Sequence, residues 1–105
     1  METATLDEKC TGSYTVEEIE YYFHKAVLNV TYIIYRQEDM EMKKKRVAFC
    51  IQYFTALRDV SDLQRSLAID ALLVNLKKID DGKDVSTETV LKVLSAVVNQ
   101  QLGKK

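Results

Sequence analysis

The chain has 105 residues, of which 47% are hydrophobic and 30% are charged. This length suits one domain, and the composition allows a buried core, which argues against a disordered chain and against a membrane-spanning one. The 15 Lys and Arg residues nearly balance the 16 Asp and Glu residues, so the net charge is −1. Such a balance argues against a general binder of polyanions.

Both ends of the chain are predicted to be tails around a single helical domain at residues 14–102. Residues 1–13 are polar and acidic and are expected to be flexible, and residues 103–105 follow the last helix. The N-terminal segment lacks the basic start and apolar run of a secretory signal, and no apolar stretch approaches the roughly 20 residues that cross a bilayer. We therefore expect a soluble, intracellular protein, cytoplasmic or nuclear, that does not contact a membrane.

The spacing of apolar residues predicts an all-α fold. No Gly or Pro occurs between Thr15 and Asp81, and apolar residues recur at intervals of three and four. The predicted helices are Val16–Arg36, Met40–Arg58, Asp62–Ile79 and Thr87–Leu102. Short connections favour a compact four-helix domain with antiparallel up-down helices. The third helix is expected to be central, because its apolar residues lie on nearly all sides.

Three capping signals support these boundaries. The predicted N-terminal caps are Thr15 with Glu18, Ser61 with Gln64, and Ser86. Gly82 marks the clearest turn of the chain, between the third and fourth helices.

The boundary between the first two helices is the least marked. Residues 36–42 contain nothing that breaks a helix, yet the apolar stripe rotates by roughly 110° across them. Because supercoiling could produce part of this rotation, one long bent helix of about 40 residues is an alternative. Globular helices of that length are rare, so we favour a break near Gln37–Asp39.

The first helix carries a second apolar face. Its main stripe consists of Val16, Ile19, Phe23, Ala26, Val27, Val30, Ile33 and Ile34, flanked by Tyr22. Tyr21, Leu28, Tyr32 and Tyr35 fall together on the opposite side, spaced 7, 4 and 3 residues apart. Three interpretations remain open. Other helices of this chain cover both sides, or the tyrosines lie over the surface with their hydroxyls in water. Alternatively, the second face binds a partner, for which Tyr is well suited.

The second helix begins with acidic residues and continues with the basic cluster Lys43, Lys44, Lys45 and Arg46. Pairing of Asp39 with Lys43 and of Glu41 with Lys45 would make this segment a self-paired, solvated helix start. The functional alternatives are a nuclear localisation signal or a phosphate contact with nucleic acid. The basic residues are spread around a whole turn without interleaved aromatic residues, which argues against nucleic-acid binding.

No pattern predicts catalysis, a metal ion or a cofactor. His24 is the only histidine and is expected to lie on the surface, with no nucleophile at a spacing that suggests a pair. Cys10 and Cys50 are expected to be reduced thiols, with Cys50 buried. A calcium loop around Gly82 fails, because Lys77 and Ile79 occupy ligand positions.

These patterns favour a non-catalytic protein–protein interaction module that acts as an adaptor, an assembly subunit or a homo-oligomer. The expected partner surface is Tyr21, Leu28, Tyr32 and Tyr35. The alternative is a small nucleic-acid-binding factor that uses Lys43, Lys44, Lys45 and Arg46.

Overall fold

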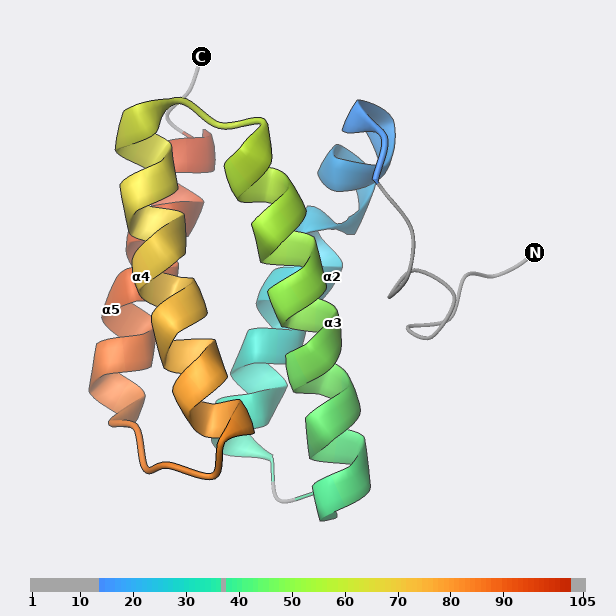
Figure 1. The fold of residues 1–105 in the computed structure, drawn as a ribbon, viewed down its shortest axis with the longest axis vertical. Helices are drawn as coiled ribbons and strands as arrows, with labels where there is room; N and C mark the ends of the chain where they lie inside the picture. Colours follow the sequence, from blue (N-terminus) through green and yellow to red (C-terminus); the bar gives the residue numbers. More distant parts are fainter. Residues whose placement is uncertain (1–13, 37, 103–105) are drawn as a thin grey trace, which may run out of the picture.

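Four antiparallel helices make up the residues that the computed structural model describes, 14–36 and 38–102. They are α2 (Val16–Tyr35), α3 (Met40–Asp59), α4 (Leu63–Asp80) and α5 (Thr87–Leu102). Each helix runs opposite to the one before it (Figure 1), which is the predicted up-down arrangement. The all-α four-helix class is confirmed, and no described residue belongs to a β-strand. The predicted tails lie outside the described residues.

The break between α2 and α3 is real, although no Gly or Pro marks it. Arg36 is extended, with φ −94° and ψ 141°. The Asp39 carboxylate accepts a hydrogen bond of 2.8 Å from the Met42 backbone N–H, so Asp39 caps α3. The structure thus confirms the predicted break, with Gln37 itself outside the described residues, and the alternative of one long bent helix is not found.

Two of the three predicted caps are found. Thr15 and Glu18 form the capping box of α2: the Glu18 N–H donates to Thr15 Oγ1 at 3.1 Å, and the Thr15 N–H donates to Glu18 Oε1 at 3.0 Å. Ser86 precedes α5 and accepts a long hydrogen bond of 3.4 Å from the Thr89 N–H.

The predicted cap at Ser61 is wrong. Asp62 caps α4 instead, accepting a 2.9 Å hydrogen bond from the Arg65 N–H. The Ser61 hydroxyl donates back to the Leu57 carbonyl at 2.6 Å and so completes the end of α3. Adjacent Ser and Asp residues can both cap a helix, and the sequence pattern alone did not distinguish them.

Gly82 follows the end of α4 and adopts the left-handed backbone conformation. Its φ is +83°, and its N–H donates to the Ile79 carbonyl at 3.0 Å, while the Lys83 N–H donates to the Lys78 carbonyl at 2.9 Å. This pair of hydrogen bonds is a Schellman motif, in which glycine is favoured because it has no Cβ. The predicted turn is therefore confirmed.

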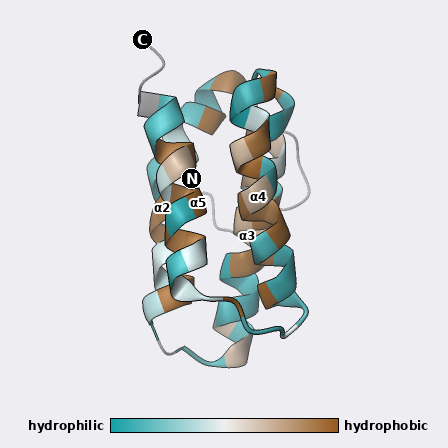
Figure 2. Cartoon of the chain, turned by 90° about the vertical axis from the view of Figure 1, so that its left-hand side faces the viewer, coloured by the Kyte–Doolittle hydropathy of each residue, from teal (hydrophilic) through white to brown (hydrophobic). Residues whose placement is uncertain are grey.

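The core forms where consecutive helices pack together. α3 contacts α2 and α4, and α4 contacts α3 and α5. Tyr53, Phe49 and Phe54 of α3 are the largest fully buried side chains, and Leu72 and Leu76 of α4 are buried beside them. Figure 2 shows apolar positions, in brown, recurring along the helices with hydrophilic positions between them.

α4 is less enclosed than its all-round apolar pattern suggests. It contacts two helices, as expected of a central element, but Leu63, Leu67 and Val74 remain exposed. At 100° per residue these three lie on one side of α4, nearly opposite the buried Leu72 and Leu76. The apolar residues of a helix are buried only where another helix of the domain packs against them.

Leu72→Ala should lower the free energy of unfolding by about 2–5 kcal/mol, because it removes a fully buried side chain from between helices. Leu67→Ala is the matched control on the exposed side of α4 and should change stability by less than about 0.5 kcal/mol. Urea denaturation at low protein concentration measures both. A loss below about 1 kcal/mol for Leu72→Ala would contradict this account of the core.

Candidate functional site

α2 turns one side to the core and leaves the opposite side open. Ala26 and Val30 are fully buried. Opposite them, Tyr21 is 78% exposed, Leu28 49% and Tyr35 60%. The structure therefore places these three residues together on the outer side of α2, as their spacing predicts.

Two expectations about the main stripe of α2 need correction. Val16 is exposed, because it is the first residue of the helix and lies beyond the packed core. Tyr22, which was expected only to flank the stripe, is buried, and its ring stands edge-on to the rings of Tyr14 and Phe49. The other stripe residues are buried or partly buried.

Tyr32 differs from the other three members of the predicted face. It is half-buried, with the Arg36 guanidinium 4.6 Å and the Arg46 guanidinium 4.8 Å from its ring centre. Cations at these distances are attracted to the ring. We use the name tyrosine face for Tyr21, Leu28, Tyr32 and Tyr35, of which Tyr32 is the member anchored to the rest of the domain.

Arg46 joins α2, α3 and the segment between them. Its Nε and Nη2 donate to the two carboxylate oxygens of Glu38 at 2.7 and 2.8 Å, and its Nη1 donates to Asn29 Oδ1 at 2.6 Å. Asn29 is buried, and its amide also donates to the Lys25 carbonyl at 2.8 Å. This bidentate geometry is the strong form of an Arg–carboxylate pair.

The charge pair shifts both titration equilibria. The hydrogen bond from Arg46 lowers the pKa of Glu38, and the same bond raises the pKa of Arg46. Each group stabilises the charged form of the other, so both are ionised at neutral pH.

The basic cluster is not the self-paired segment that we expected. Among the described residues no ion pair joins Asp39 to Lys43 or Glu41 to Lys45. Instead Arg46 turns inward to Glu38, while Lys44 and Lys45 are exposed and Lys43 is half-buried. Periodicity within α3 could not reveal this, because Asn29 is 17 residues away and on another helix.

A groove lies beside the tyrosine face, between α2 and α5. Its volume is about 360 Å³, and it is lined by Phe23, His24, Val27, Leu28, Thr31 and Val98. Leu28 belongs to both surfaces and connects them. No sequence pattern predicts this groove, because it depends on where α5 packs. α5 reaches the core through α4, and its contact with α2 is sparse.

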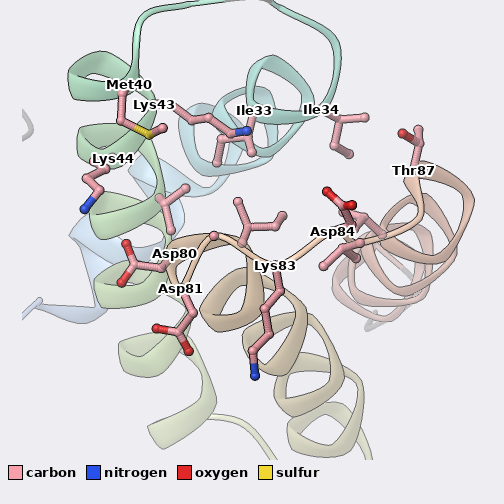
Figure 3. Close-up of a pocket in the computed structure, with 15 residues that line it drawn as sticks. Ile33, Ile34, Met40, Lys43, Lys44, Asp80, Asp81, Lys83, Asp84 and Thr87 are labelled. Carbon is pink, nitrogen blue, oxygen red and sulfur yellow. The ribbon is translucent and has the colours of Figure 1, made fainter.

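A second hollow lies at the end of the bundle, where the last turn of α2 and the first turns of α3 meet the α4–α5 turn. It has a volume of about 560 Å³ and an apolar floor. Lys43 reaches over Ile33, Asp84 lies beside Ile34, and Lys83 points away from them (Figure 3). Charges of both signs surround the floor, so no single ligand charge is favoured.

Three further polar side chains could carry chemistry: His24, Cys50 and Tyr53. His24 is exposed on α2. Cys50 is fully buried, as predicted, and its thiol donates to the Ala26 carbonyl at 3.7 Å; burial raises the pKa of this thiol, which makes it unreactive. The buried Tyr53 hydroxyl donates to the Ile19 carbonyl, and burial raises its pKa as well. Cys10 lies outside the described residues.

Within residues 14–36 and 38–102, no three His, Cys, Asp or Glu side chains are grouped as metal ligands would be. No helix in this part of the chain is long and apolar enough to cross a membrane. Comparisons with protein-family models, curated proteins and solved structures find no match to this chain.

Arg46→Gln should lower the free energy of unfolding by about 1–3 kcal/mol, because it leaves the buried Asn29 amide without its donor. Lys45→Gln, in the same cluster but exposed, should change stability by less than about 0.5 kcal/mol. Chemical denaturation measures both free energies of unfolding. If the two substitutions lowered them equally, the structural role assigned to Arg46 would be wrong.

Glu38→Gln should lower the melting temperature at neutral pH, and this deficit should vanish in acid. Because the folded state lowers the pKa of Glu38, the pair contributes stability above the ordinary glutamate pKa of about 4.3 and loses it as the pH falls further. Thermal melts from pH 7 to about pH 3 test this. A deficit that stays constant over the whole range would show that the Glu38 charge is not responsible.

Proposed function

We propose that this protein is a non-catalytic protein–protein interaction module that binds its partner along the tyrosine face and the adjoining α2–α5 groove. One observation carries the proposal: α2 buries its main stripe in the core, yet Tyr21, Leu28 and Tyr35 stay exposed beside an apolar groove. Single exposed apolar residues are ordinary, but contiguous patches are typical of binding sites.

The chemistry of this surface suits a protein segment with an apolar anchor. The groove can accept an aliphatic or aromatic side chain beside Phe23 and Val27, while the Tyr21 and Tyr35 hydroxyls can form hydrogen bonds at the rim. A helix laid along the sparse contact between α2 and α5 would bury both surfaces at once. Such helix-in-groove binding is a common mode of peptide recognition.

The anchored position of Tyr32 supports the same proposal. Because the Arg36 and Arg46 guanidinium groups both lie against its ring, Tyr32 loses little freedom when a partner covers it. Rigid aromatic residues at the centre of an interface often contribute most of the binding energy.

Nucleic-acid binding by the basic cluster is the weaker alternative. Arg46 is engaged with Glu38 and Asn29, which leaves three lysines. Glu38, Asp39 and Glu41 lie close by in sequence and reduce the positive field. No observation of the structure favours this function.

A photo-crosslinking residue at position 21 tests the proposal in cells of the source organism. We expect a discrete protein adduct from position 21 and none from Lys92, an exposed position on α5. Leu28→Asp should reduce the yield of the adduct by about tenfold or more, because Leu28 belongs to both the tyrosine face and the groove and the substitution places a charge there.

Leu67→Asp is the matched control, since Leu67 is exposed on α4, whose main contacts are with α3 and α5. It should leave the adduct unchanged, and circular dichroism should show both variants folded. An adduct that survives Leu28→Asp, or equal labelling from positions 21 and 92, would overturn the proposal.

A further inference from the structure

The tyrosine face carries the same residue type at equal distances on either side of Leu28. Tyr21 precedes Leu28 by seven residues, Tyr35 follows it by seven, and all three side chains are exposed. Seven residues make two turns of a helix–helix seam, so the three point in nearly one direction. A second α2 that runs antiparallel would therefore meet this face with the identical pattern.

The two ends of α2 carry opposite charges. Its first two turns hold three acidic residues: Glu17, Glu18 and Glu20. No Asp or Glu occurs from position 21 to position 36, and Arg36 at the end of the helix has a side chain that is 54% exposed. Arg36 approaches Glu38 only to 3.9 Å, because Arg46 holds that carboxylate at 2.7 and 2.8 Å. An antiparallel copy of α2 would thus complement these charges.

The helices beside α2 do not lie over the tyrosine face. α3 packs on the side of α2 that carries Asn29, and α5 lies beside Val27 across the groove. The exposed parts of Tyr21, Leu28 and Tyr35, taking about 200 Å² for each whole side chain, amount to roughly 400 Å². A standard interface buries about 800 Å² on each partner, so a helix pair formed here would be weak and concentration-dependent.

We propose that the partner at the tyrosine face is a second copy of this chain, with the two α2 helices antiparallel about a two-fold axis at Leu28. This register sets Tyr21 level with Tyr35 of the other copy and brings the two Leu28 side chains together at the axis. Because Leu28 lines the groove, each copy supplies the aliphatic anchor at the edge of the other copy's groove.

The same register brings opposite charges to the same level. Glu20 and Arg36 both lie eight residues from Leu28, so the acidic end of one α2 meets the basic end of the other. Lys25 becomes level with the neutral Thr31. A parallel pair would instead set the three acidic residues against themselves and align the helix dipoles unfavourably. The inference rests on the proposed function, because it names the partner of the same surface.

Sedimentation equilibrium between about 5 and about 500 µM protein tests the dimer, a range suited to an interface of less than standard size. We expect the mass to rise from one chain to two. Leu28→Asp should remain a monomer throughout, and Leu67→Asp on α4 is the matched control that should dimerise normally. Tyr21→Ala, at a side chain that is 78% exposed and outside the core, should stay folded and weaken the dimer by about tenfold.

Spin labels at position 17 test the antiparallel register. Glu17→Cys in a Cys10→Ser background gives one labelled site, because Cys50 is fully buried. Position 17 lies eleven residues from Leu28, which is about 17 Å along the helix. Double electron–electron resonance should therefore give a distance of about 33 Å, whereas a parallel pair would place the two positions about 10 Å apart.

Three results would overturn the inference: a monomer at the highest concentration, a dimer that survives Leu28→Asp, or the short distance of a parallel pair. The crosslinked adduct from position 21 separates this inference from the proposed function. An adduct of two copies of this chain supports both. A monomeric chain with an adduct to a different protein would overturn only the inference, and the absence of any adduct would overturn the proposed function.

Discussion

The Arg46 guanidinium ties α2 to α3 and reinforces the rotation that burial of the apolar stripe gives α2. This planar group is held by both carboxylate oxygens of Glu38 and donates to the buried Asn29 amide. The fixed fork of donors allows only one arrangement of these partners. Because Arg46 lies in the second turn of α3, the side of α2 that carries Asn29 must face α3.

The exposed surfaces follow from this rotation and from the order of packing. With Asn29 directed at α3, Ala26 and Val30 enter the core, and Tyr21 and Tyr35 lie on the opposite side of α2. α5 packs on α4, so it does not close the bundle against α2, and the groove remains between them. The buried stripe of α2, the Arg46 contact and the sparse packing of α5 on α2 thus account for the site that we propose for a partner.

Local features of the sequence predict the helices and much of the tyrosine face. Capping residues such as Thr15 mark the helix starts, and the spacing of Tyr21, Leu28 and Tyr35 is enough to place them together. The role of Arg46 could not be predicted in this way, because it depends on a partner in another helix. The exposure of Leu67 could not either, since an apolar pattern does not tell how many neighbours a helix will have.

The central claim is that α2 buries one side and leaves the tyrosine face open. Photo-CIDNP NMR measures it most directly, because a photoexcited dye reacts only with those tyrosine side chains that solvent can reach. The account predicts strong polarisation of Tyr21 and Tyr35, and none of the buried Tyr22 and Tyr53. Protection of Tyr21 and Tyr35 to the level of Tyr53 in the dilute protein would contradict it.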